Sequence, residues 1–214
     1  MSTAGRTIGT TGALAGVVLD LGNVLIDWDP FDAVAAGVGH DEARAFLDAD
    51  DFDFHAWNHG PDSGMSWADA EAAVARRHPH WLPHAEAYRA HFVASLRGEV
   101  PGTADVVREL HAVGVPLWGL TNWSAELYPH APDRFEVLGL LRDVVVSGVE
   151  GVAKPDPRIF AVLAGRVDVA LERLVLVDDR EVNVEAARAA GMDAIRFTDA
   201  AALRAALVER GLLA

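Results

Sequence analysis

The chain has 214 residues and a formal net charge of −14, and 51% of its residues are hydrophobic. This acidic balance argues against a surface for nucleic acid or an anionic membrane, which basic side chains attract. The length suits one core domain with an inserted subdomain. Cysteine is absent, which excludes disulfides, thiol nucleophiles and thiolate zinc sites. We expect a cytoplasmic protein that is a monomer or a homodimer.

The N-terminal segment is not expected to belong to the fold. Residues 1–13 are mostly small and polar, which is typical of a flexible leader. The apolar run that ends at Leu19 is too short for a signal peptide or a membrane span, and Asp20 follows it directly. A first β-strand at 17–19 explains this run better.

The rest of the chain alternates between strand and helix patterns. Further short apolar runs rich in β-branched residues lie at 115–120, 144–146, 174–177 and 194–197. Amphipathic patterns that predict helices lie at 103–113, 157–165, 182–190 and 200–210. This order of elements predicts an α/β fold with a Rossmann-like parallel sheet whose strands are buried on both faces.

A long helical insertion separates the first two strands. Residues 30–98 show helical patterns at 41–48, 66–77 and 83–96, with no strand as clear as those of the core. We expect this segment to form a cap, and residues 14–29 and 99–214 to form the core.

Two polar clusters in the insertion resemble metal sites superficially. The acidic residues from Asp48 onward lack the glycine and the glutamate that an EF-hand loop requires. The histidines at 78, 80 and 84 are interrupted by prolines and have no carboxylate ligand pattern nearby. We interpret both clusters as surface features.

Polar residues follow the predicted core strands at the ends where ligands bind in parallel α/β sheets. In chain order these residues are Asp20, Thr121 and Asn122, Lys154, and the pair Asp178 and Asp179. A carboxylate, a hydroxyl, a lysine and a carboxylate pair together suit the handling of a phosphoryl group with a metal. The sequence therefore predicts that these side chains converge.

Asp20 is the candidate nucleophile, because a carboxylate can attack phosphorus and form an aspartyl-phosphate. Three carboxylates in one place repel each other at neutral pH, and a hard divalent cation with oxygen ligands removes this conflict. Asp178 and Asp179 therefore predict Mg²⁺. Adjacent strand residues point in opposite directions, and we favour Asp179 as the direct ligand.

The remaining polar residues suit a phosphate. The hydroxyl of Thr121, the side chain of Asn122 and backbone amides at a following helix start are candidate phosphate contacts. Lys154 is the only lysine beside 17 arginines, and its compact ammonium suits a crowded anionic site. In the sequence Lys154-Pro-Asp-Pro, the aspartate can cap a helix that starts at the second proline.

These residues resemble the motifs of the haloacid dehalogenase superfamily of hydrolases. Four motifs follow in family order across 14–200: Val-Leu-Asp20-Leu-Gly-Asn-Val-Leu, Leu-Thr121-Asn122-Trp, Lys154-Pro-Asp-Pro, and Val-Asp178-Asp179 with Asn183-Val-Glu-Ala-Ala after it. The resemblance implies a Rossmann-like core, Asp20 as the nucleophile and a C1-type cap for the insertion. A subgroup with Asp-Leu-Gly-Asn-Val, which includes a bacterial phosphatase of glucose 1-phosphate, is most similar.

One position departs from the family pattern. Phosphatases of the family usually carry a second aspartate two residues after the nucleophile as general acid, and Gly22 stands there. A general acid contributes ~10²–10⁴-fold, so a good leaving group, a replacement from the cap or slow turnover is required. His55 and His59 are candidate replacements. The Gly22 carbonyl can still bind the metal, as this position does in the family.

Four residues of the insertion stand where such caps often carry a loop that faces the site: Trp57, Asp62, Gly64 and Trp67. For the two tryptophans, a purely structural role is an equally good interpretation.

The favoured hypothesis is a Mg²⁺-dependent phosphatase of a small phosphorylated metabolite, with a sugar phosphate among the candidates. A metal-independent 2-haloacid dehalogenase is the first alternative, since halide needs no proton and Gly22 would be harmless. That chemistry leaves Asp178 and Asp179 unexplained, and related dehalogenases carry an aromatic residue in place of Gly22. A catalytically weak phosphate-binding protein is the second alternative. No Walker loop and no G-x-S-x-G elbow occurs.

Overall fold

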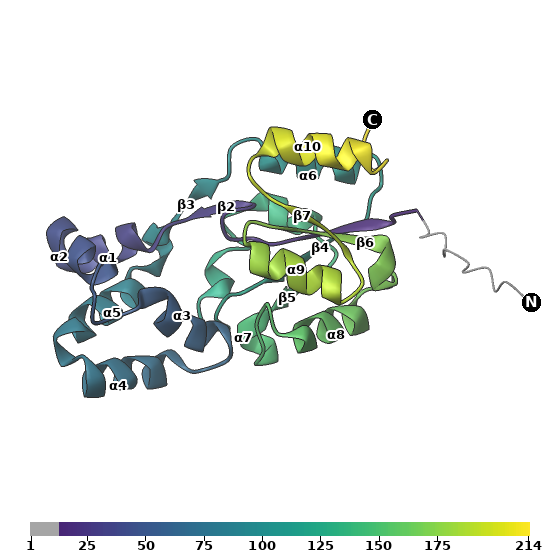
Figure 1. The fold of residues 1–214 in the computed structure, drawn as a ribbon. Helices are drawn as coiled ribbons and strands as arrows, with labels where there is room; N and C mark the ends of the chain where they lie inside the picture. The colour runs from purple at the N-terminus through teal and green to yellow at the C-terminus, as the bar shows by residue number, and fades with distance from the viewer. Residues whose placement is uncertain (1–12) are drawn as a thin grey trace, which may run out of the picture.

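A five-stranded parallel sheet forms the centre of the computed structural model, which describes residues 13–214 (Figure 1). The strand order is β5-β4-β1-β6-β7, and β1 lies between β4 and β6. The strands are β1 Gly16–Leu19, β4 Leu117–Thr121, β5 Val144–Val146, β6 Leu174–Asp178 and β7 Asp193–Arg196. The predicted α/β parallel-sheet fold is confirmed, with strand ends that differ by one or two residues.

Helices cover both faces of this sheet. Successive residues of β1 point to opposite faces, so that Val17 packs in one hydrophobic cluster and Val18 in another. Among the core helices, α6 Thr103–Ala112 and α10 Ala200–Glu209 pack in the first cluster, and α8 Pro157–Arg166 and α9 Glu181–Ala189 pack in the second. Burial on both faces explains why the strands read as continuous apolar runs.

The insertion forms a helical group to one side of the sheet (Figure 1). Its helices are α1 Pro30–Val38, α2 His40–Leu47, α3 Phe54–Asp62, α4 Trp67–Arg77 and α5 Leu82–Ala90. Two of these, α1 and α3, had no predicted counterpart. The helix expected at 83–96 was too long, because α5 stops at Ala90 and a strand begins at Leu96. His84 is buried against Phe46 and Trp81, so its interpretation as a surface residue was wrong.

A short antiparallel pair, which the sequence did not predict, joins the two ends of the insertion. Strand β2 (Ile26–Trp28) pairs with β3 (Leu96–Glu99), with Ile26 opposite Glu99. This pairing holds the segment that leads from the core into the insertion beside the segment that leads back to the core. A short helix, α7 (Ser147–Glu150), follows β5. Between residues 13 and 214, no helix has both the length and the apolar character needed to cross a membrane. The leader expected at 1–13 lies outside the described residues, apart from Ala13.

Candidate active site

Lys154 joins two of the predicted carboxylates in the protein interior. Its Nζ lies 2.7 Å from Oδ2 of Asp178 and 3.1 Å from Oδ1 of Asp20, and it donates to the Leu120 carbonyl at 2.6 Å. Lys154 and Asp178 are fully buried, and Asp20 is 7% exposed. The ends of β1, β4 and β6 therefore meet at one ammonium group, as the sequence predicted.

The local frame of Lys154 also agrees with the sequence. Oδ1 of Asp156 accepts from the Arg158 amide at 2.9 Å and so caps α8, and Pro157 is the first residue of that helix. The Lys154 amide donates to Oδ1 of Asn122, whose Nδ2 donates to the Lys154 carbonyl, both at 2.8 Å. Asn122 thus holds the backbone on both sides of the Lys154 side chain.

The electrostatics of this cluster follow from burial and pairing. Burial, opposed by Lys154 and reinforced by Asp178 and Asp179, raises the pKa of Asp20 to about 7. Burial would also raise the pKa of Asp178, but Lys154 and its hydrogen bonds hold that pKa below the usual value. Burial alone would lower the pKa of Lys154, and Asp20 with Asp178 raises it above the ordinary range.

A third carboxylate, Asp179, completes an acidic cluster. One oxygen from each of Asp20, Asp178 and Asp179 lies within 4.8 Å of the other two. Burial and the neighbouring Asp178 raise the pKa of Asp179. Three ionised carboxylates and one ammonium leave a net charge of −2, which a divalent cation cancels. The all-oxygen donor set suits Mg²⁺, which prefers oxygen ligands.

The residues that the sequence predicted as phosphate contacts differ in their exposure to the adjoining cavity. Thr121 ends β4 and is 1% exposed, and neither it nor Lys154 is among the described residues that line the adjoining cavity. Asn122 lines this cavity, but its side-chain oxygen and one side-chain N–H form hydrogen bonds to the Lys154 backbone.

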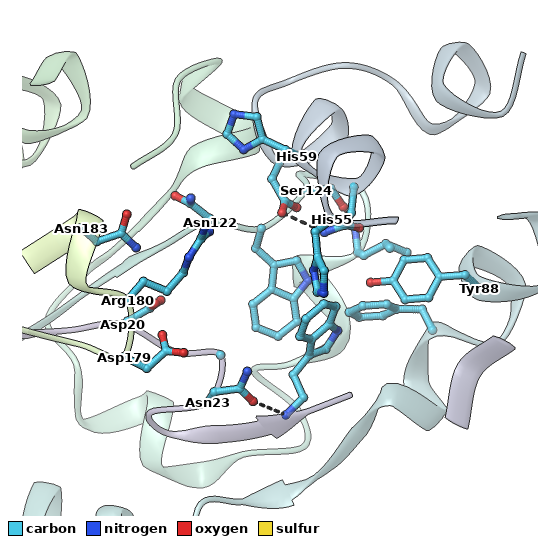
Figure 2. A pocket seen from close by; sticks show the side chains of 17 residues that line it. Asp20, Asn23, His55, His59, Tyr88, Asn122, Ser124, Asp179, Arg180 and Asn183 are labelled. Atoms are coloured by element: carbon cyan, nitrogen blue, oxygen red, sulfur yellow. Dashed lines mark hydrogen bonds between the residues drawn. The ribbon is translucent and has the colours of Figure 1, made fainter. Parts of the chain in front are cut away.

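A cavity of about 150 Å³ lies beside the carboxylates. Asp20, Asp179 and Arg180 lie on one side of it and Tyr88 lies on the other (Figure 2). Its apolar wall is aromatic, apart from one leucine, and consists of Trp28, Tyr88, Phe92, Trp123 and Leu127. The insertion and the core both contribute to this wall, so the cavity lies at their junction.

Gly22, at the position where the family's phosphatases usually carry the general acid, borders this cavity. The candidate replacements His55 and His59 line it as well. Both histidines are exposed, and Nε2 of His59 lies 3.3 Å from the Ser63 hydroxyl. Asp62, the last residue of α3, lines the same cavity.

Trp57 and Trp67 of the insertion have structural contacts. Their rings pack edge to face with their centroids 5.3 Å apart, and Nε1 of Trp57 donates a hydrogen bond to the Ala70 carbonyl. Trp67 is buried and its Nε1 donates to the Ser124 hydroxyl in the core. Neither ring is among the described residues that line the cavity.

Sequence reasoning assigned no role to two residues that shape the site. Asn183 is buried, and its Nδ2 donates to both oxygens of Asp178 at 2.9 and 3.1 Å. The Arg180 amide donates to Oδ1 of Asp178, and its guanidinium group lines the cavity. The signal available was their position at the start of the helix after the Asp178-Asp179 pair.

Comparisons with known proteins agree with this geometry. The family model of haloacid dehalogenase-like hydrolases matches residues 14–191. A curated relative, the sesquiterpene phosphatase astK of Aspergillus oryzae, is 30% identical over 97 residues, which is 45% of this chain. The match spans only half the length of that relative.

Solved structures share the fold at low sequence identity. A haloacid dehalogenase family enzyme of Bacteroides thetaiotaomicron, crystallised with magnesium and inorganic phosphate, has a TM-score of 0.68 at 16% identity, covering 87% of this chain and 96% of that one. The crystal structure of a dehalogenase has a TM-score of 0.64 at 18% identity, covering 86% of this chain and 85% of that one. At these identities the likenesses show the fold alone.

Proposed function

Because the chain belongs to the haloacid dehalogenase-like hydrolases, we propose that it is a Mg²⁺-dependent phosphatase of a small phosphorylated metabolite, acting through an aspartyl-phosphate on Asp20. One observation carries this proposal: Lys154 pairs with Asp20 and Asp178, while Asp179 adds a third carboxylate at the cavity. The motif positions support it, and so does the curated phosphatase relative.

Asp20 has one oxygen held and one left for attack. Its Oδ1 accepts from the Leu21 amide at 2.7 Å and lies beside Lys154. Within residues 13–214 Oδ2 has no hydrogen-bond or ion-pair partner, and Asp20 lines the cavity. We therefore assign the attack on phosphorus to Oδ2, with Oδ1 anchored so that the carboxylate keeps its orientation.

Mg²⁺ would be held by Asp20, Asp179 and the Gly22 carbonyl. Asp178 would support these ligands without binding the metal directly. Asp178 accepts hydrogen bonds from Lys154, Asn183 and the Arg180 amide, which occupy both of its oxygens. Asp179 accepts no side-chain hydrogen bond from the described residues, which supports it as the direct ligand. When bound, the cation neutralises charge on phosphate and keeps Asp20 ionised despite its raised pKa.

Thr121 and Lys154 would act on the phosphate from the floor of the site. Phosphoryl transfer needs positioning and charge stabilisation more than covalent chemistry. Thr121 ends the strand next to β1, which supports a contact from its hydroxyl to the phosphate although the side chain is buried outside the cavity lining. The Lys154 ammonium offsets the charge of Asp20 and of the phosphate.

The aromatic wall bears on the alcohol part of the substrate. A sugar ring can stack on such a wall, and an apolar alcohol buries area against it. The curated relative is a sesquiterpene phosphatase, which favours an apolar alcohol; the first-motif subgroup favours a sugar phosphate. A phosphate-release screen with sugar phosphates and prenyl phosphates in Mg²⁺ separates the two.

The mechanism is tested with an aryl phosphate, with and without EDTA. We expect chelation to abolish phosphate release and Mg²⁺ to restore it. Full activity in EDTA, or in an Asp20→Asn variant, would overturn the mechanism. Chloride release from 2-chloropropionate without metal would instead establish the dehalogenase alternative. Phosphate binding without turnover of any ester would establish the weak phosphate-binding alternative.

A further inference from the structure

The turn between α3 and α4 is fastened to the core at three points. The Ser147 hydroxyl, at the start of α7, donates to the Asp62 carbonyl. The amide of Trp67 donates to the Glu126 carboxylate at 2.9 Å, and its indole donates to Ser124 at 3.0 Å. All three core partners lie in the segments that follow β4 and β5, next to the candidate site. The last residue of α3 is therefore fixed over the cavity.

Close backbone packing reinforces this attachment. Gly64 has a φ of +98°, and a Cβ there would lie 3.0 Å from the Cα of Gly151. A residue with a side chain would be strained by the positive φ and would push the turn away from the core. The turn can approach this closely because both contacting residues are glycines. Such an attachment holds the side chain of Asp62, at the end of α3, in a fixed position relative to the reacting groups of the core.

Asp62 has the surroundings of a carboxyl group that keeps its proton. It is partly buried and lines the cavity, and Nδ2 of Asn58 donates to its Oδ2 at 2.9 Å. No cation of residues 13–214 forms an ion pair with it. It also ends a helix, where the helix dipole disfavours negative charge. Burial, partly offset by the Ser124 backbone amide, raises the pKa of Asp62 to about 7.

The two histidines on the same helix are less suitable donors. His55 and His59 are exposed, so bulk water competes with a leaving group for their hydrogen bonds. His59 also lies within hydrogen-bond distance of Ser63, the residue that follows its helix. A general acid works best when its pKa is close to the working pH and water does not compete for its proton. Asp62, with a pKa of about 7, meets the first condition, and its side chain is less exposed than either histidine.

We infer that Asp62 is the general acid that replaces the aspartate missing at Gly22. The inference rests on the proposed phosphatase function. As Oδ2 of Asp20 bonds to phosphorus, the bond from phosphorus to the alcohol oxygen breaks, and the Asp62 proton moves to that oxygen. The alcohol leaves neutral and Asp62 is left ionised. Water then displaces Asp20 from phosphorus and gives one proton to Asp62, which restores both residues.

The test compares two esters that differ in their need for a proton. The dinitrophenolate of 2,4-dinitrophenyl phosphate leaves unprotonated, whereas the alkoxide of 2-phenylethyl phosphate requires protonation. We expect Asp62→Asn to lower kcat for the alkyl ester by ~10²-fold or more, in line with the usual contribution of a general acid. The rate for the dinitrophenyl ester should fall less than about threefold, which also shows that the variant folds.

The pH profile gives a second readout. For wild type, kcat for the alkyl ester should fall above about pH 7, as Asp62 loses its proton. This basic limb should be absent in Asp62→Asn. Other titratable or charged groups also surround the cavity: His55 and His59 on α3, Tyr88 on α5, Asp20 after β1, and Asp179 with Arg180 after β6. His55→Gln and His59→Gln serve as matched variants, in which we expect no selective loss on the alkyl ester.

The possible outcomes distinguish failure of the Asp62 role from failure of the proposed phosphatase function. If wild type releases phosphate from neither ester with Mg²⁺, both the phosphatase and the role of Asp62 are wrong. If wild type hydrolyses both esters, equal losses on the two in Asp62→Asn and Asp62→Ala would overturn the general acid alone. Selective loss in either histidine variant, with Asp62→Asn unaffected, would assign the proton to that histidine.

Discussion

Nζ of Lys154 lies 2.7 Å from Oδ2 of Asp178, and both side chains are completely buried. A buried ion pair gains little over a hydrophobic pair, but removing one partner strands an uncompensated charge in the interior. This geometry explains the use of a single lysine in an arginine-rich chain. The pocket that the ammonium occupies also includes the Leu120 carbonyl at 2.6 Å and Asp20 at 3.1 Å.

Lys154→Arg should lose most activity although it keeps the charge. A planar guanidinium group is wider than an ammonium and cannot fit between these three partners without moving them. Displacements of about 1 Å at a reacting centre can cost ~10²-fold, so we expect a loss of that order in kcat. Steady-state kinetics on an aryl phosphate measure it. The exposed Arg158→Lys is the matched control. Near-normal turnover in Lys154→Arg would mean that the lysine is incidental.

Lys154→Met should destabilise the protein by about 3–5 kcal/mol, because Asp178 then keeps a buried charge without a partner. Asp178→Asn, added to Lys154→Met, should recover part of this loss. Urea unfolding of the two single variants and the double variant gives the coupling free energy of the pair. Additive losses would show that the two side chains do not interact.

Asp179→Asn should weaken Mg²⁺ binding with little effect on folding. Asp179 is only half-buried and accepts no side-chain hydrogen bond from the described residues, whereas Asp178 is tied to three partners. Activity measured against Mg²⁺ concentration should show a half-saturation value raised at least ~10-fold. The exposed Asp133→Asn controls for the loss of one charge. An unchanged half-saturation value would remove Asp179 from the ligand set.

Asn122→Ala distinguishes a positioning role from phosphate binding. If Asn122 acts by holding the Lys154 backbone, its loss removes two hydrogen bonds of 2.8 Å, lowers kcat and costs about 1–3 kcal/mol of stability. KM and inhibition by inorganic phosphate should then change little. A large rise in KM with unchanged stability would instead support the direct phosphate contact that the sequence favoured.

The sequence predicted the core well because its signal is local. Val17 and Val18 belong to a strand buried on both faces, so the run is apolar without interruption. Asp20 and Lys154 follow such runs, and the parallel topology brings the strand ends together. Strands β2 and β3 were missed because Ile-Asp-Trp and Leu-Arg-Gly-Glu are short, partly polar and defined by their mutual pairing.

The insertion was harder to predict because its contacts are long-range. His84 reads as a surface residue, yet its ring packs against Phe46, 38 positions earlier in the chain. The surroundings of Asp62 depend on Ser147, which lies 85 residues away and fixes the end of α3 to the core. No local pattern marks such contacts, so the sequence directed attention to the two cavity histidines instead.

Asp62→Asn should stabilise the protein at alkaline pH while it impairs the enzyme. The folded-state pKa of about 7 lies above the model value of 3.8, so ionised Asp62 opposes folding. The cost is fully present above pH 7, falls as pH drops from 7 towards 3.8, and is lost only below pH 3.8, where both states are protonated. It amounts to at most about 4 kcal/mol, since each pKa unit corresponds to about 1.4 kcal/mol.

Thermal unfolding at pH 4.5, 6 and 8 therefore gives a direct measure of the Asp62 proton, without any substrate. The Tm of Asp62→Asn should exceed that of wild type by several degrees at pH 8, and the difference should shrink at pH 6 and be smallest at pH 4.5. Asp133→Asn, at an exposed site, should show no such trend. A difference in Tm that is the same at all three pH values would mean that Asp62 is ionised throughout, and a permanently ionised carboxylate has no proton to give the leaving group.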